Sequence, residues 1–258
     1  MPNDFDKAAK NYDATFTYSS IGKAQRERVY HYLKQEIKSK KKLSILELNC
    51  GTGEDAIFLT NQGHKVIATD ISSEMITEAT SKNDSITFLQ QDITTITSET
   101  FTETFDLIFS NFGGLNCLSK EQLKAFINTS EALLKPNGKL VFVIMPKHCL
   151  WEQFYFFIKG DFKKMNRRKS KQEVVANVDD VNVPTWYFNP SELKTLTKNK
   201  FTLSLLKPIG ISIPPSYLEP FFISKKRFLK LLISFEKWLS STFWSKFADH
   251  YIISFQKK

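Results

Sequence analysis

Residues 43–53 read LSILELNCGTG, in which an apolar stretch runs directly into a loop that holds two glycines. A short apolar run bounded by a turn is typical of a buried β-strand. Apolar spacing then predicts a helix from about Glu54 to Gln62, ended by Gly63. A strand, a glycine loop and a helix in this order predict a nucleotide-type site. The glycines let the backbone approach a ligand, and the helix start offers free N–H groups.

The rest of the chain alternates in the same way. Further strands are expected at residues 65–69, 86–90, 105–109, 139–145, 201–206 and 251–255. Helices are expected at residues 22–40, from Ser72 or Ser73, at 119–134, 190–199 and, as one long stretch, 221–247. Nearly continuous apolar strands between helices imply a parallel sheet covered on both faces. We therefore predict one α/β, doubly wound domain over residues 1–258.

Acidic residues stand at two of the predicted strand ends. Glu47 lies just before the glycine loop, and Asp70 ends the second strand, where an acid can accept hydrogen bonds from ribose hydroxyls. Gly51 and Gly53 supply the turn. The dinucleotide fingerprint G-x-G-x-x-G is absent: position 56 is Ala56, a tolerated substitute, and there is no glycine at position 49.

Residues 47–53 resemble the first motif of class I S-adenosylmethionine-dependent methyltransferases, acidic-x-G-x-G-x-G, with Asn49 in place of the first glycine. Asparagine tolerates left-handed backbone better than most residues. Further stretches are similar to other segments of that family: FDKAAKNYD (5–13), ATDISSEM (68–75), FLQQDI (88–93), FDLIFSNFG (105–113) and LLKPNGKLVFVI (133–144). The first of these is similar to methyltransferases that act on quinones and other small molecules.

The resemblance implies a Rossmann-like sheet of seven strands in the order 3-2-1-4-5-7-6, with strand seven antiparallel. It also implies S-adenosylmethionine as cofactor and S-adenosylhomocysteine as product. Asp70 would bind the ribose, Asp92 the adenine amino group and the backbone of Ile93 an adenine ring nitrogen. The candidate cofactor-binding residues are Tyr12, Glu47, Asn49, Gly51, Gly53, Asp70, Ile71, Met75, Asp92, Ile93 and Ser110. Met75 is also a candidate for the core.

The formal net charge of +9 is concentrated in two segments. Residues 159–171 hold seven Lys/Arg and one Asp, and residues 219–237 hold five Lys/Arg and two Glu. In the implied topology both belong to helical lid insertions, at residues 150–185 and 212–248, on the active-site edge of the sheet. Residues 1–40 would form an N-terminal helical cap.

The two insertions are rich in aromatic residues, which suits a small apolar or aromatic acceptor. Their basic residues also suit an acceptor that carries an anionic group. One alternative is that these aromatic residues only pack the insertions onto the sheet. Another is that the insertions dock peripherally on an anionic membrane surface. His148 and His250 are expected near the acceptor, as a general base or as structural groups.

The predicted function is methyl transfer to a small molecule. The alternatives are an RNA methyltransferase or a catalytically silent, cofactor-binding partner protein. Residues 110–113, SNFG, lack the Asn/Asp-Pro-Pro-aromatic run of base N-methyltransferases, which disfavours nucleic acid as a partner. Three cysteines without metal-like spacing predict no metal site and a cytoplasmic location. No secretory leader or membrane span is expected, and the oligomeric state is left open.

Overall fold

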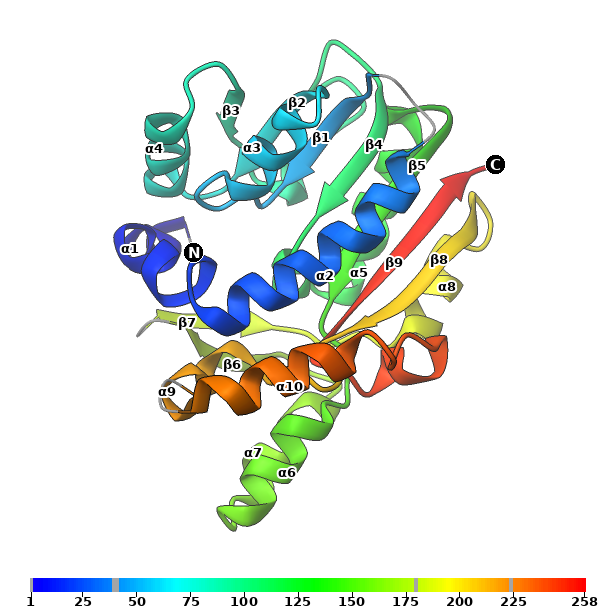
Figure 1. Ribbon diagram of the computed structural model, residues 1–258. Helices are drawn as coiled ribbons and strands as arrows, with labels where there is room; N and C mark the ends of the chain where they lie inside the picture. The colour runs from blue at the N-terminus through cyan, green and yellow to red at the C-terminus, as the bar shows by residue number, and fades with distance from the viewer. Residues whose placement is uncertain (1, 39–41, 179–180, 223–224) are drawn as a thin grey trace.

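The computed structural model describes residues 2–38, 42–178, 181–222 and 225–258. Its main sheet has seven strands in the order β3-β2-β1-β4-β5-β9-β8 (Figure 1). The strands are β1 Ser44–Leu48, β2 Lys65–Asp70, β3 Thr87–Gln90, β4 Phe105–Ser110, β5 Leu134–Ile144, β8 Phe201–Ile209 and β9 His250–Lys257. Only the pairings that involve β9 are antiparallel. The predicted seven-strand order is confirmed, with β8 and β9 as the sixth and seventh strands.

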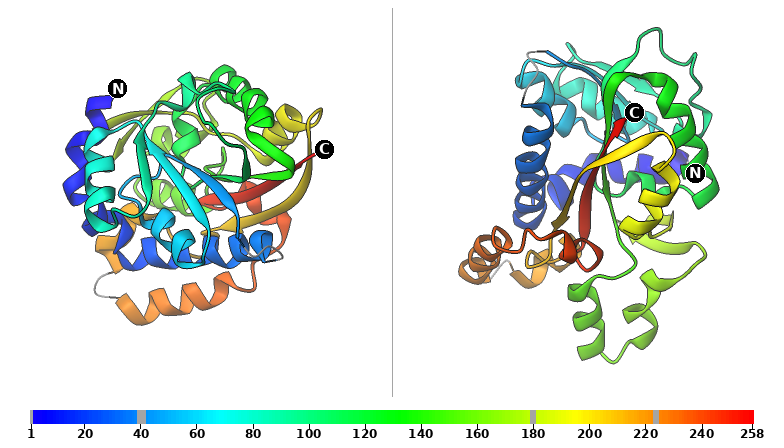
Figure 2. Two further views of the ribbon diagram at one scale, coloured as in Figure 1. Left: turned by 90° about the horizontal axis from the view of Figure 1, so that it is seen from above. Right: turned by 90° about the vertical axis from the view of Figure 1, so that its right-hand side faces the viewer.

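Helices cover both faces of this sheet (Figure 2). They are α2 Ser20–Ile37, α3 Glu54–Asn61, α4 Ser73–Lys82, α5 Lys120–Leu133 and α8 Pro190–Thr197. Neighbouring residues of one strand face opposite sides. In β1, Ile45 packs in the cluster with α2 and α3, and Leu46 packs in the cluster with α5 and α8. Strands buried on both faces explain the nearly continuous apolar runs in the sequence.

The N-terminal segment is helical before and after a bend. Helix α1 covers Pro2–Tyr12, and a wider helical turn over Asp13–Thr17 follows it. Helix α2 begins at Ser20, because the Ser19 side chain accepts a hydrogen bond from the Gly22 backbone N–H and caps the helix. The last two positions of the predicted helix at residues 22–40 lie outside the described residues.

The first insertion is not wholly helical, which corrects our expectation. Helices α6 Leu150–Ile158 and α7 Phe162–Met165 are followed by a hairpin of β6 Val174–Val178 and β7 Val181–Thr185. The signal for this hairpin is its high valine content, as in VVANV and VNVPT, because valine favours extended backbone. The expected insertion at residues 150–185 was helical throughout, so the hairpin was not predicted.

The predicted continuous helix at residues 221–247 is also wrong. The chain forms α9 Glu219–Phe222, α10 Lys226–Glu236 and a 3₁₀ turn at Thr242–Lys246, with residues 223–224 outside the described part. After α10, Ser241 adopts extended backbone and its hydroxyl accepts a hydrogen bond from the Phe243 backbone N–H, which caps the new turn. Other 3₁₀ turns lie at Ile93–Thr95, Gly114–Cys117, Arg167–Lys169 and Ser216–Leu218.

Both insertions lie at one edge of the main sheet. Residues 150–185 follow the end of β5, and residues 212–248 connect the end of β8 to the start of β9. Because β9 is antiparallel to both neighbours, its start lies at the edge where β5 and β8 end. This is the edge at which α/β sheets bind their ligands. Within the described part of the chain, no helix is long and apolar enough to cross a membrane.

Candidate functional site

The loop between β1 and α3 depends on glycine at Gly53. Its φ is +79°, and a Cβ there would lie 2.9 Å from both the Ala79 and Phe88 side chains. A side chain at this position would therefore be strained in the backbone and would clash with α4 and β3. Gly53 allows the start of α3 to lie close to β2 and β3. The helix start and the ends of these two strands therefore lie at one edge of the sheet.

Asn49 fills the gap between this loop and β4. It has left-handed backbone, with φ +48°. Ser110 Oγ donates to Asn49 Oδ1 over 2.6 Å, and Asn49 Nδ2 donates to the Asn111 carbonyl over 3.0 Å. A Cβ on Gly114 would lie 2.0 Å from Asn49 Cγ, so a glycine makes room for the amide. The hydroxyl of Ser110, a predicted cofactor-binding residue, is thus used to hold Asn49.

Glu47 carries an unsatisfied polar atom. The residue is 1% exposed, and its Oε2 has no hydrogen-bond partner. Burial, with the Asp55 charge as the next cause, raises the pKa of Glu47 well above its usual value. A buried carboxyl oxygen without a partner costs free energy unless a donor arrives. Glu47 is therefore suited to a ligand with a cationic donor.

The carboxylate of Asp70 organises the end of β2. It accepts hydrogen bonds from the Gly51 backbone N–H at 2.9 Å and the Ser72 backbone N–H at 3.0 Å. Burial raises the pKa of Asp70, although these N–H groups act in the opposite direction. Each carboxylate oxygen can accept a second hydrogen bond. Asp70 therefore joins the glycine loop to the end of β2 and keeps acceptor capacity for a ligand.

Three other candidates, Ile71, Asp92 and Ile93, follow the ends of the neighbouring strands β2 and β3. The Gln91 backbone N–H donates to the Asp70 carbonyl over 2.8 Å, which brings the end of β3 beside it. Asp92 follows and caps the turn at Ile93–Thr95, with its carboxylate accepting from the Thr94 N–H and hydroxyl. The carbonyl of Ile71 accepts a hydrogen bond from the Gln90 side chain. The sequence-predicted adenosine residues are thus grouped at the ends of β2 and β3.

The N-terminal segment contacts the glycine loop directly. A Cβ on Gly51 would lie 3.7 Å from the Tyr12 ring, and Thr52 Oγ1 donates to Asp13 over 2.6 Å. Met75, a predicted ligand residue, is 3% exposed and packs in a cluster with Ala8 and Ala9 of α1. Tyr12 is thereby placed at the site, and Met75 serves the contact between α1 and α4.

Sequence reasoning missed a buried polar cluster beside the loop. Arg26 donates to Asp55 Oδ1 over 2.7 Å, and Asn111 donates to Asp55 Oδ2 over 2.9 Å. Arg26 is 8% exposed, and its Nε has no partner. All three residues line a small cleft together with Tyr12 and the glycine loop. The available signal was an arginine three residues before Val29, on the apolar face of the predicted helix.

Aromatic rings extend from this cleft to His250. The ring centroid of Phe112 lies 5.0 Å from that of Phe16 and 5.6 Å from that of His250. The Arg26 guanidinium lies 5.1 Å from the Phe112 centroid. His148 instead packs against Phe247 at 6.2 Å. Burial and nearby lysines lower the pKa of His148. Of the two predicted histidines, His250 is therefore the one placed against a residue of the cleft.

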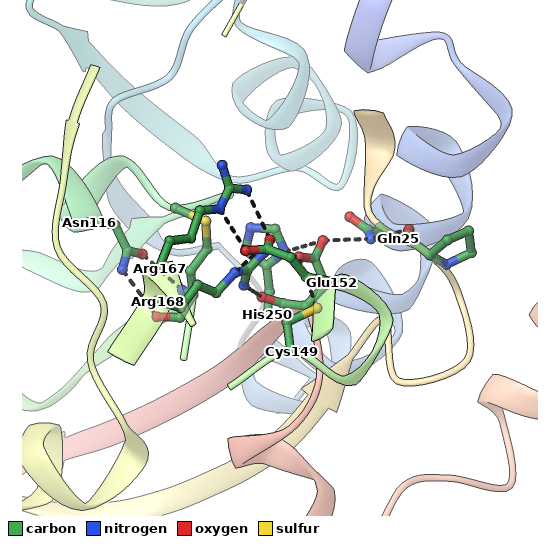
Figure 3. A network of polar contacts seen from close by, with 10 residues as sticks. Gln25, Asn116, Cys149, Glu152, Arg167, Arg168 and His250 are labelled. Carbon is green, nitrogen blue, oxygen red and sulfur yellow. Dashed lines mark hydrogen bonds and ion pairs between the residues drawn. The ribbon is translucent and has the colours of Figure 1, made fainter. Parts of the chain in front are cut away.

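Part of the first basic segment is internal (Figure 3). Arg168 donates to Asp249 Oδ1 over 2.8 Å and to Glu152 Oε2 over 3.0 Å, and Arg167 donates to Glu152 Oε1 over 2.6 Å. The Gln25 side chain donates to the other oxygen of Asp249. This network joins α6, the following turn, α2 and the start of β9. Two of the basic residues therefore hold the insertion in place rather than facing a ligand.

A second hollow is lined by residues such as Ser98, Phe101 and Lys135. It lies where β4 and β5 begin, at the opposite edge from the glycine loop. The unsatisfied buried atoms of Glu47 and Arg26 lie at the glycine loop instead. We therefore take the smaller cleft at the loop as the candidate site.

The glycine loop and the ends of β2 and β3 lie within a match to a known protein family. Residues 45–138 match the model of a methyltransferase domain family. The chain is 37% identical over 114 residues to the putative methyltransferase YqeM of Bacillus subtilis, a match over 43% of this chain and 45% of that protein. The chain spans about half the length of the curated relatives it matches.

Two solved structures share the fold over nearly the whole chain. A complex described as DhpI-SAM-HEP has a TM-score of 0.62 and 19% identity, over 98% of this chain and 94% of that one. The 1,6-didemethyltoxoflavin-N1-methyltransferase of Burkholderia thailandensis, with its substrate and S-adenosylhomocysteine bound, has a TM-score of 0.58 and 17% identity, over 100% and 86%. Residues 45–138 are thus similar to a methyltransferase domain, and the seven strands have the order that the resemblance implied.

Proposed function

We propose that the protein transfers a methyl group from S-adenosylmethionine to a small apolar or aromatic acceptor. The observation that carries the proposal is the pair of buried, unpartnered polar atoms at the glycine loop, Glu47 Oε2 and Arg26 Nε. One suits the ammonium and the other the carboxylate of an amino-acid moiety. Asp70 suits the ribose hydroxyls, and Asp92 with the Ile93 backbone suits adenine.

When bound, S-adenosylmethionine supplies a methyl group already activated on a sulfonium. The protein's task is then to align the acceptor and exclude water. The rings of Tyr12, Phe16 and Phe112 offer an apolar wall beside the loop. This wall supports an apolar or aromatic acceptor, as do the small-molecule methyltransferases among the proteins of similar fold.

His250 is our candidate for the proton acceptor. Its ring packs on Phe112, and its Nδ1 lies 3.2 Å from Asp249 Oδ2. A carboxylate on one imidazole nitrogen leaves the other to accept a proton from an acceptor hydroxyl or carbon acid. His148 lies against Phe247 and is the weaker candidate.

Cofactor binding is expected to release a proton from Glu47. Because the pKa of Glu47 is raised, its carboxyl in the free protein stays protonated to a higher pH than an ordinary glutamate does. A bound ammonium favours the ionised carboxylate instead. Affinity for S-adenosylmethionine should therefore rise with pH until Glu47 ionises unaided, by at most about tenfold per pH unit. Calorimetry in two buffers of different ionisation enthalpy measures the released proton.

The matched variants are Glu47→Gln and Glu99→Gln, the second at an exposed loop residue. Glu47→Gln should weaken binding by roughly 10- to 100-fold and abolish proton release, because a charge-assisted hydrogen bond is lost. Glu99→Gln should behave as the unaltered protein. Unchanged affinity in Glu47→Gln would refute the ammonium assignment, and no binding by the unaltered protein would refute the proposed function.

A further inference from the structure

Exposed apolar side chains are concentrated in the two insertions. Of the sixteen large apolar side chains that are exposed in the described part of the chain, twelve lie within residues 150–162 and 217–243. Single exposed apolar residues are ordinary, but a concentration of them marks an interaction surface. This surface has two parts, α10 and an arm formed by α6 and α7.

Helix α10 carries an unpartnered apolar stripe. Phe228, Leu231, Phe235 and Trp238 follow one another at spacings of three, four and three residues, which places them on one side of the helix and its final turn. They are 46%, 51%, 54% and 85% exposed. The opposite side of the helix packs inward, with Leu229 in a cluster that includes Ile21 of α2. The stripe therefore faces away from the body of the protein.

The acidic residues of this segment are used internally. Glu236 accepts hydrogen bonds from the backbone N–H groups of residues 210–213, after β8. Glu219 accepts from the backbone N–H groups of Ser20 and Ile21, at the start of α2. The basic residues beside the stripe are exposed: Lys225, Lys226, Arg227, Lys230 and Lys237. The outer surface of α10 is therefore both apolar and positively charged.

The arm repeats this combination. Phe154, Phe157, Ile158 and Phe162 are each about 60% exposed or more, and Lys159, Lys163 and Lys164 are exposed among them. On its inner side, Trp151 packs against Phe222, next to α10. Figures 1 and 2 show the arm projecting from the same end of the molecule as α10. Two apolar, basic elements thus lie at one end.

We propose that this surface docks on an anionic phospholipid bilayer. Aromatic and leucine side chains would enter the boundary between headgroups and acyl chains, and the lysines and Arg227 would lie among the phosphates. A projecting arm with apolar side chains enters a fluid interface readily, whereas a protein partner must offer a matching hollow. A second copy of this chain would bring two positive surfaces together. The inference does not depend on the proposed function.

Vesicle sedimentation tests the proposal, with phosphatidylcholine vesicles that either contain or lack phosphatidylglycerol. The full chain should bind the anionic vesicles and release them as salt rises, and bind phosphatidylcholine alone weakly. Trp238→Ser and Phe157→Ser should each weaken binding roughly tenfold, because each loses an inserted aromatic ring. Leu203→Ser, at an exposed position of β8, is the matched control and should not change binding.

Tryptophan fluorescence gives a second readout. Emission should shift to the blue on anionic vesicles, and the shift should shrink in Trp238→Ser while circular dichroism stays unchanged. Absence of binding to anionic vesicles at low salt would overturn the proposal, as would full binding by both serine variants. Concentration-dependent dimerisation that Trp238→Ser abolishes would assign the surface to a second copy. Saturable binding to an acidic protein, without vesicle binding, would assign it to a protein partner.

Discussion

Asp70→Asn is expected to weaken S-adenosylmethionine binding by about 100-fold, the largest loss we predict for a single polar substitution at the site. Two effects combine. The carboxylate that would accept the ribose hydroxyls loses its charge. In addition, asparagine has a single oxygen acceptor and its amide nitrogen accepts no hydrogen bond, so either the Gly51 or the Ser72 N–H group loses its partner at the end of β2.

Calorimetry with S-adenosylmethionine gives the affinity, and urea unfolding reports whether the fold survives. Asp84→Asn, an exposed carboxylate in the loop before β3, is the matched control and should bind as the unaltered protein does. If Asp70→Asn stays folded and binds with unchanged affinity, Asp70 does not bind the cofactor. A loss of binding that merely follows global unfolding would reveal a structural role alone.

Arg168→Met is expected to destabilise the protein by about 3–5 kcal/mol, because it leaves two buried carboxylates without their shared partner. Burial by itself would raise the pKa of Asp249, but His250 and Arg168 outweigh it and hold that pKa below its usual range. Burial would likewise raise the pKa of Glu152, but Arg168 and Arg167 outweigh burial and lower this pKa. Arg167→Met should cost less, because Arg167 lies nearer to solvent and contacts only one of the two acids.

The pH dependence provides an independent check. In the unaltered protein the lowered pKa values make these acids stabilising above their ordinary pKa of about 4, and this contribution is lost as the pH falls towards the folded-state values. In Arg168→Met, burial without the guanidinium favours the protonated acids, so the stability deficit should narrow on acidification. Urea unfolding between neutral and mildly acidic pH measures this. A deficit that does not vary with pH would contradict the charge argument.

Most of the fold followed from local sequence patterns. The first five strands and the helices between them are recognisable because each apolar run ends at a turn or capping residue, as at Gly63 and Ser72. The errors fall in the insertions, where structure depends on distant partners. Glu236 ends α10 while binding backbone of the loop after β8, some 25 residues earlier. The spacing of apolar residues within 221–247 carries no information about this contact.

The same limit applies to the site. Residues of the glycine loop and the strand ends were found because they are close in sequence and in a fixed order. Arg26 meets Asp55 across 29 residues, and Arg168 meets Asp249 across 81. In the sequence Arg168 looks like an ordinary surface charge, and only the folded chain shows that it is buried and paired. A count of charges likewise could not distinguish the buried Arg168 from the exposed lysines near it in the sequence.

The contact between Asn49 and Gly114 also constrains how this sequence can change over time. The amide of Asn49 occupies the space that any larger residue at Gly114 would need. A substitution at Gly114 is therefore accessible only after Asn49 has become smaller, while the reverse order passes through a clashing intermediate. The two positions are expected to covary across descendants of this chain, and a lineage that acquires glycine at position 49 would be released from the constraint at position 114.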